Sequence, residues 1–188
     1  MDTLPDKKKA IFESTLELIK DHGFQGAPMS QVAKNAGVAA GTIYHYFESK
    51  DQLIGELYSY YMNKVIAEVK AALVDNQSYK DGFFKVWSQL LAFYITNPNV
   101  LIFFEQFVNS PYYIQRYRDK SHERPLYNFF QEGIKSGQLK SLKPELLLSL
   151  TFGSIVSTAK LHLLGSSALD ETDLNQIPAI LWEGIAIE

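Results

Sequence analysis

The sequence predicts an all-α protein of about nine helices, with a small N-terminal three-helix domain carrying a helix-turn-helix and a larger C-terminal helical domain. Three observations support this fold class. Apolar residues recur at helical intervals of three and four, residues 30–53 read as helix, tight turn and helix, and 46% of the residues are hydrophobic, which suffices for a core. The expected domains are residues 1–50 and 51–188.

The first two helices are expected over residues 6–22 and about 28–36. Gly23 ends the first, and Pro28 lies in the first turn of the second, where a missing N–H costs little. One face of the second helix carries apolar residues at i, i+3, i+4 and i+7, namely Met29, Val32, Ala33 and Ala36. Gly37 then occupies the position where a left-handed residue commonly ends a helix.

Residues 38–47 predict the second short helix of the pair. Small residues open it and polar ring or hydroxyl side chains follow, in the order Ala39, Ala40, Gly41, Thr42, Tyr44, His45 and Tyr46. The three consecutive rings cannot all face a core, because adjacent helical positions point in different directions. The spacing alone leaves two interpretations open: a DNA recognition helix, or an ordinary helical hairpin whose aromatic side chains fill space.

The remaining helices are expected near residues 50–75, 80–97, 99–109, 121–136, 144–164 and 172–187, with a loop or short helix over 111–120. The helix that begins at residue 50 is too long to belong only to the N-terminal domain, so it should connect both domains. Pro178 lies inside the last segment and should kink that helix or move its start.

The segment GVAAGTIYHYFESKDQL resembles the signature of the TetR family of bacterial transcriptional repressors. Ten positions match in register over 17 residues: Gly37, Val38, Gly41, Thr42, Ile43, Tyr44, Tyr46, Phe47, Lys50 and Leu53. The close resemblance covers roughly residues 8–56. It implies a ligand-responsive regulator, expected to be a repressor, that binds a palindromic double-stranded DNA operator as a homodimer and is released by a small, largely apolar or aromatic effector.

Carried over by position, the resemblance assigns DNA contacts to nine residues. Phosphate contacts fall to Thr42, Tyr44, His45, Tyr46 and Lys50, base contacts to Ala40 and Gly41, and additional contacts to Ser30 and Gln31. Residue 27 is alanine where the family usually has Ser or Thr, which weakens the helix cap.

The charge of the N-terminal domain gives less support to DNA binding. Residues 1–50 hold six lysines and six acidic residues, so their net charge is 6 − 6 = 0. Lys7, Lys8 and Lys9 begin the first helix, where positive charge opposes the helix dipole and is expected to gain nothing structurally. For Lys34, ordinary solvation is the favoured interpretation.

Aromatic residues crowd the stretch from Tyr79 to Phe130. They are interpreted either as core packing or as the wall of an apolar ligand pocket, and the resemblance implies such a pocket here. The candidate pocket residues are Trp87, Phe103, Phe107, Tyr113 and Phe130, with Gln106 and Asn109 as hydrogen-bonding groups. Glu105 could select an amine, although an exposed or ion-paired carboxylate is the favoured interpretation.

Residues 144–164 form a helix that is apolar on nearly every side. The resemblance implies that this helix and the last one associate with their copies as a four-helix bundle, whereas the alternative is an ordinary core helix in a monomer. The candidate dimer residues are Phe152, Ile155, Val156, Leu181, Trp182 and Ile185.

Other classes of protein find little support. The chain has no cysteine, its N-terminus shows no signal peptide and no apolar run suits a membrane span, so a cytoplasmic protein is expected. The four histidines show no metal-binding or catalytic spacing, and neither an enzyme, a metal site nor a cofactor is predicted. The remaining alternative is a helical ligand-binding or scaffold protein without operator binding.

Overall fold

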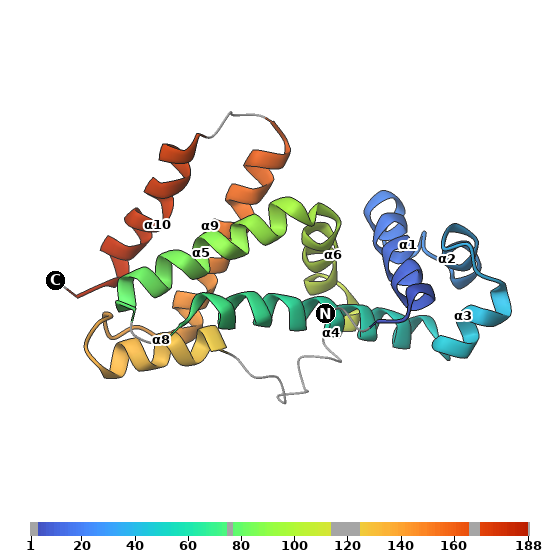
Figure 1. Ribbon diagram of the computed structural model, residues 1–188, viewed down its shortest axis with the longest axis horizontal. Coiled ribbons are helices and arrows are strands. Elements are labelled where there is room, and N and C mark those ends of the chain that lie inside the picture. The colour runs from blue at the N-terminus through green and yellow to red at the C-terminus, as the bar shows by residue number, and fades with distance from the viewer. Residues whose placement is uncertain (1–3, 75–76, 114–124, 166–169, 188) are drawn as a thin grey trace. The chain divides into compact units, whose positions relative to one another are not determined.

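The computed structural model describes residues 4–74, 77–113, 125–165 and 170–187, and within these ranges the chain forms nine α-helices and one isolated β-bridge, between Leu139 and Ala186 (Figure 1). The helices are α1 (Asp6–His22), α2 (Met29–Asn35), α3 (Ala40–Tyr46), α4 (Lys50–Ala72), α5 (Tyr79–Thr96), α6 (Pro98–Val108), α8 (Pro125–Lys135), α9 (Pro144–Leu163) and α10 (Glu171–Ile185). The all-α prediction is confirmed. The expected loop or short helix over 111–120 and the expected helix start at 121 fall largely outside the described residues.

The described chain divides into two compact units. The first holds residues 4–62 and 99–113, and the second holds residues 63–98 and 125–187, without their undescribed gaps. α4 contributes its first part to one unit and its last part to the other. The expected boundary at residue 50 stays a prediction.

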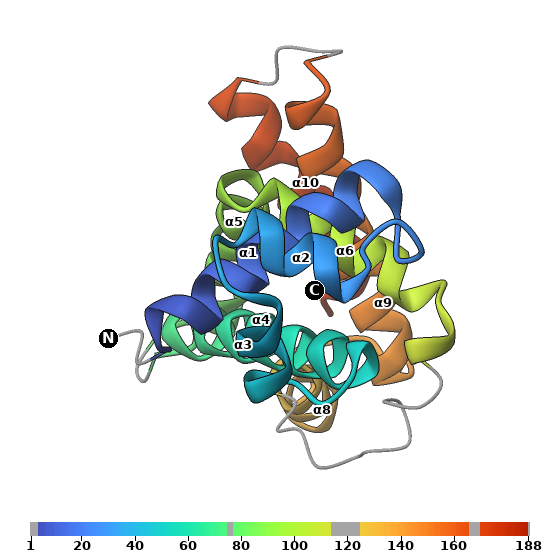
Figure 2. The ribbon, with the colours of Figure 1, turned by 90° about the vertical axis from the view of Figure 1, so that its right-hand side faces the viewer.

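Helices α1, α2 and α3 of the first unit enclose a small core (Figure 2). Phe12, Val32 and Ile43 contribute one buried side chain from each helix, and Phe47 follows α3 with 0% exposure. The turn between α2 and α3 contains Gly37 with φ 66°, the left-handed conformation that the sequence predicts.

Lys8 fastens the start of α1 to α4. Its Nζ lies 2.6 Å from Oε2 of Glu56, and it sits 5.9 Å from the ring centroid of Phe12 and 5.3 Å from that of Phe47. A cation over an aromatic face is attracted by the ring quadrupole. The expectation that this lysine gains nothing structurally is therefore wrong. Helix periodicity alone does not show which residue of another helix lies opposite a side chain.

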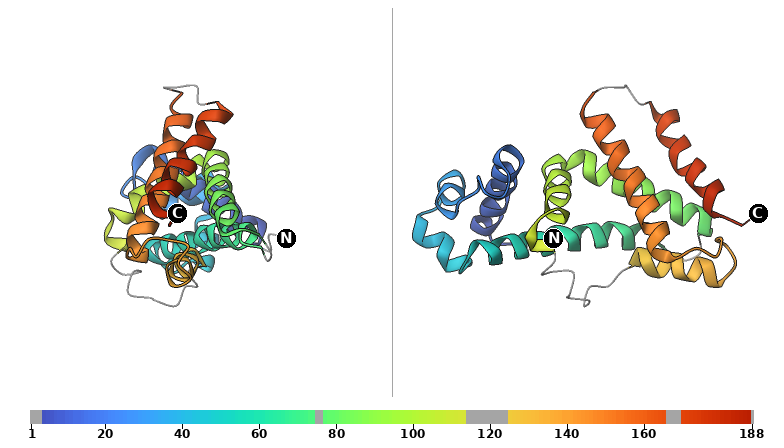
Figure 3. Two further views of the ribbon diagram at one scale, coloured as in Figure 1. Left: turned by 90° about the vertical axis from the view of Figure 1, so that its left-hand side faces the viewer. Right: turned by 180° about the vertical axis from the view of Figure 1, so that it is seen from behind.

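The second unit is built around α9, which packs against α5, α8 and α10. Figure 3 shows the orange α9 crossing the green α5. Trp87 of α5 is 1% exposed, and its Nε1 donates a hydrogen bond of 2.9 Å to Oγ of Ser154 on α9. The start of α10 is fixed by a capping box between Asp170 and Asp173, so Pro178 lies inside the helix rather than at its start.

Gly133 of α8 makes room for Tyr79 of α5. The Tyr79 ring stacks on the Phe129 ring at 4.1 Å, and its hydroxyl donates to the Phe129 carbonyl oxygen. Burial raises the pKa of this hydroxyl. A Cβ atom at position 133 would lie 2.2 Å from the Tyr79 oxygen, which is too close for any real contact.

Replacing Gly133 with alanine should therefore destabilise the fold. We expect Gly133→Ala to lower the free energy of unfolding by about 1–3 kcal/mol, the usual cost of overpacking. Gly41→Ala is the matched control, because a Cβ there meets nothing within 4 Å; it should be neutral or stabilising by up to about 1 kcal/mol. Urea denaturation measures both values, and equal values for the two variants would contradict this packing.

Candidate functional site

The exposed face of α3 is the candidate nucleic-acid interface. Ile43 is completely buried, whereas Ala40, Gly41 and His45 are exposed and Tyr44 is 56% exposed. Because Gly41 has open space where a Cβ would be, the backbone at the start of α3 is accessible to a large partner. The helix thus buries one side and presents small residues, a phenol and an imidazole on the other.

The remaining DNA candidates lie beside this face in sequence. Thr42 and Tyr46 are half-buried, and the Tyr46 ring lies 5.9 Å from that of His45. On α2, Ser30 is exposed, and Gln31 donates a hydrogen bond of 2.9 Å from Nε2 to Oδ1 of Asn35. These side chains carry hydrogen-bond donors and acceptors, and none of them is a lysine or an arginine.

Lys50 has a role that the sequence did not indicate. It is half-buried at the start of α4, and its ammonium group donates to the carbonyl oxygen of Phe24, in the segment that joins α1 to α2. Burial lowers the pKa of Lys50, and the nearby Asp51 carboxylate opposes that change. Because an ammonium group has three N–H donors, this internal bond leaves two of them for a DNA phosphate.

The expected pocket residues are distributed over both units. Trp87 and Phe130 belong to the second unit, and Phe103, Phe107 and Tyr113 belong to the first. All but the half-buried Tyr113 are at most 1% exposed. They pack against other rings; Tyr58, for example, stacks on Phe107 at 4.3 Å. Core packing accounts for these contacts, and a role in a ligand pocket stays a prediction.

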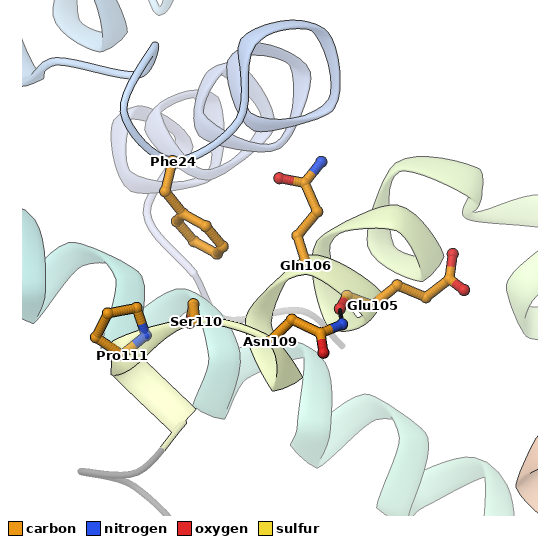
Figure 4. Close-up of a pocket in the computed structure, with 6 residues that line it drawn as sticks. All are labelled: Phe24, Glu105, Gln106, Asn109, Ser110 and Pro111. Carbon is orange, nitrogen blue, oxygen red and sulfur yellow. Dashed lines mark hydrogen bonds between the residues drawn. The ribbon is translucent and has the colours of Figure 1, made fainter.

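A shallow hollow of about 520 Å³ lies in the first unit, where α1 and α6 end (Figure 4). Its lining consists of Phe24, Glu105, Gln106, Asn109, Ser110 and Pro111. Gln106 and Asn109 are the two expected ligand residues in it. Sequence reasoning missed Phe24, Ser110 and Pro111, although the proline after an apolar helix is a signal of a helix end.

The Phe24 ring forms one side of the hollow and is itself held by neighbouring rings. It lies 6.0 Å from the ring of Phe103 and 5.2 Å from that of Tyr112. Burial raises the pKa of Tyr112, and the charge of Asp51 adds to the effect. The Nε2 atom of Gln106 donates a hydrogen bond of 3.1 Å to the Ile19 carbonyl oxygen, so α6 is bonded to the end of α1.

Two of the six expected dimer residues belong to the interior of the second unit. Ile155 is 0% and Ile185 is 5% exposed, so neither can form an outward face of this chain. Phe152, Val156, Leu181 and Trp182 are half-buried, and the Trp182 ring lies 5.6 Å from that of Phe83. A helix that is apolar on nearly every side does not reveal from its sequence which side faces inward, so the role of these residues in a dimer stays a prediction.

The outward side of α9 carries a regular stripe of exposed residues. It follows helical spacing and consists of Leu146, Leu150, Gly153, Ser157, Leu161 and Leu164. Among the described helices, α9 alone is long and apolar enough to cross a membrane, with 28% of its most apolar window buried inside this chain. Length and composition do not assign α9 to a membrane, since core helices meet the same criteria.

Comparison with known proteins agrees with this arrangement. Residues 11–57 match the family model of bacterial regulatory proteins of the tetR family, and residues 78–186 match the tetracyclin repressor-like C-terminal domain. The "Fatty acid metabolism regulator protein" of Bacillus subtilis is 26% identical over 185 residues, 95% of each chain.

Solved structures show the same fold. A TetR family transcription regulator from Marinobacter aquaeolei VT8 superposes with a TM-score of 0.88 at 26% identity, over 97% of each chain. The regulator FadR of Bacillus subtilis, solved with stearoyl-CoA, has a TM-score of 0.67 at 23% identity over 93% of this chain and 95% of its own. With both parts of the chain matched by family models, this protein belongs to the TetR family of helix-turn-helix transcriptional regulators.

Proposed function

We propose that this protein is a repressor that binds a palindromic DNA operator as a homodimer and leaves it when a small, largely apolar effector binds. The observation that carries the proposal is the division of α3 into two sides. Ile43 is fully buried, while Ala40, Gly41, Tyr44 and His45 face outward. This is the arrangement that a recognition helix needs in order to enter a major groove.

The proposed phosphate contacts rely on hydroxyl and imidazole groups, with Lys50 as the one ammonium group of the set. Thr42, Tyr44, His45 and Tyr46 would bind phosphates, and Ala40 and Gly41 would approach bases closely. Ser30 and Gln31 of α2 are the additional candidates. Ala40 can contribute only apolar contact with a thymine methyl group, or its backbone, to base recognition. Contacts of this kind position the helix without a large positive charge.

Several lysines of this region are engaged within the chain. Lys8 pairs with Glu56 and Lys50 with a carbonyl oxygen. The exposed lysines are Lys7, Lys9, Lys20 and Lys34, of which Lys9 lies 4.0 Å from Glu13 and Lys20 lies 3.8 Å from Asp21. If only Lys7 and Lys34, the two outside these pairs, bind DNA, a dimer neutralises roughly four phosphates, which corresponds to a salt slope of roughly −4.

Selection of bound sequences from a random duplex library, at two salt concentrations, tests the function. We expect a palindrome whose half-site centres lie about 34–36 Å apart, because a two-fold dimer places its recognition helices one helical turn apart. The logarithm of the affinity should fall with that shallow slope. Recovery of no motif by folded, dimeric protein would favour a ligand-binding or scaffold protein without operator binding.

The hydroxyl of Tyr44 allows a sharper test of the contact residues. We expect Tyr44→Phe to weaken operator binding by about tenfold to a hundredfold, because a hydrogen bond to a charged group contributes roughly 1.5–3 kcal/mol. Folding stability should not change, since the side chain is 56% exposed. Tyr127→Phe on α8 is the matched control and should bind like the unaltered protein. An unchanged affinity of Tyr44→Phe would remove this residue from the interface.

The exposed stripe of α9 is the proposed centre of the dimer interface. Leucines flank Gly153 and Ser157, and small residues at the middle of a stripe allow two helices to approach closely. The exposed Ile180 of α10 and the half-buried Phe152, Val156, Leu181 and Trp182 would add to the interface. A second copy of the chain would cover apolar area that a monomer leaves in water.

Gly153→Leu tests this interface without disturbing the chain itself, because a Cβ at Gly153 meets nothing within 4 Å. We expect the dissociation constant of the dimer to rise at least about tenfold, which is equivalent to about 1.4 kcal/mol of binding free energy. Ala71→Leu on an exposed position of α4 is the control. Sedimentation at a series of concentrations measures both, and equal dissociation constants would place the dimer contact elsewhere.

The many aromatic residues of this chain, one relative and one structure of similar fold support an apolar effector. The relative from Bacillus subtilis is a fatty acid metabolism regulator, and one structure of similar fold holds stearoyl-CoA. Long-chain acyl compounds are therefore the first candidates to screen against an operator complex. The effector must bind the operator-free state more tightly than the operator-bound state. α4 is the proposed lever, since it runs unbroken from Lys50 to Ala72.

A further inference from the structure

The hollow at the ends of α1 and α6 has the size of a small-molecule site and contains none of the residues proposed to contact DNA. Its volume of about 520 Å³ falls within the range of known ligand pockets. Figure 4 shows the Phe24 ring and the Gln106 carboxamide on either side of the open space, with Asn109, Ser110 and Pro111 along its edge. All six lining residues belong to the first compact unit.

The hydrogen bonds of the lining side chains determine which atoms remain for a ligand. Gln106 donates from Nε2 to the Ile19 oxygen at 3.1 Å, and Asn109 donates from Nδ2 to the Glu105 carbonyl oxygen at 2.9 Å. Ser110 donates from Oγ to the Phe107 oxygen at 2.7 Å. Because carbonyl oxygens only accept, these bonds also fix which end of each amide is nitrogen.

The side chains therefore offer mostly acceptors to a ligand. Gln106 Oε1, Asn109 Oδ1 and Ser110 Oγ each keep lone pairs, whereas each amide keeps one N–H and the serine hydroxyl keeps none. A ligand that matches this lining must bring N–H or O–H donors.

The charge around the hollow favours a cation. α1 ends at His22 and α6 ends at Val108, and a helix C-terminus carries partial negative charge on its last carbonyl groups. The carboxylate of Glu105 adds to this, although Glu105 already has a partner elsewhere in the chain. Lys20 and His22, in the last turn of α1, and Lys50, which donates to the Phe24 carbonyl oxygen, oppose the effect. Lys20 is offset by Asp21 at 3.8 Å and Lys50 by the charge of Asp51.

The segment that follows α1 already binds one ammonium group of the chain itself, because Lys50 donates to the carbonyl oxygen of Phe24. The aromatic ring of Phe24 adds a face that attracts cations and packs against apolar groups. We propose that this hollow is a second ligand site, which binds a primary organic ammonium ion. Its three N–H donors meet the oxygens of Gln106, Asn109 and Ser110, and its carbon body lies against Phe24 and Pro111.

Titration of the full-length dimer with n-butylammonium, without DNA, tests the site. The observed signals are the side-chain amide protons of Gln106 and Asn109 in a nitrogen–proton correlation spectrum. We expect saturable shifts with butylammonium, weaker shifts with butan-1-ol, which has the same chain without the charge, and none with butanoate. Non-saturating shifts, or equal responses to all three compounds, would overturn the proposal.

Variants of the exposed Asn109 provide a second test of the ammonium site. Asn109→Lys places an ammonium group at the hollow and should weaken butylammonium binding at least tenfold, whereas Asn109→Asp should strengthen it several-fold. Asn128→Lys, at an exposed position of α8, adds the same charge elsewhere and should leave binding unchanged. Equal weakening by both lysine variants would show an effect of net charge alone and contradict the site. Because no DNA is present, the result is independent of operator binding.

Discussion

The burial of Ile43, and of Phe47 with its ring 5.8 Å from that of Phe12, is the constraint on which the proposed DNA contacts depend. Each of these side chains is at most 1% exposed, and burying such a side chain contributes about 1.5–3 kcal/mol. Because successive helical positions lie about 100° apart, fixing Ile43 inward sends Tyr44 and His45 outward. The identity of the exposed face thus follows from the core, and changes in that core would rotate the contact residues.

The connection between α1 and α2 shows a second kind of constraint, in which helices fasten a short irregular segment through its carbonyl groups. Gln106 of α6 donates to the Ile19 carbonyl oxygen in the last turn of α1, and Lys50 of α4 donates to the Phe24 carbonyl oxygen in the connection. Each of these oxygens also accepts a backbone N–H, from Gly23 and Ala27 respectively, so the side-chain donors add a second bond to each. The turn therefore keeps one shape only while α4 and α6 hold their places within the first unit.

The sequence predicted the fold class and most helices well, since these depend on local pattern. Gly37 takes the expected left-handed conformation, Ile43 and Phe47 are buried as the spacing predicts, and family models match both parts of the chain. The features that the sequence did not predict depend on partners distant in sequence. Lys8 finds Glu56, a carboxylate that helix periodicity does not place, and Ile155 faces inward on a helix whose pattern does not distinguish its sides. The hollow beside Phe24 is also non-local, since its lining comes from two segments about eighty residues apart.

The internal engagement of Lys8 and Lys50 has a consequence for how the protein would search a chromosome. Attraction to DNA of arbitrary sequence comes almost entirely from exposed positive charge. A DNA-binding protein that engages two lysines in intramolecular bonds, and binds phosphates mainly with hydroxyl and imidazole groups, would have a short residence time on unrelated sequence. It would slide over short tracts and travel mainly by dissociating and rebinding. Its occupancy of the correct site would then depend mainly on discrimination among sequences, and would vary less with salt than that of a protein that neutralises about six to ten phosphates.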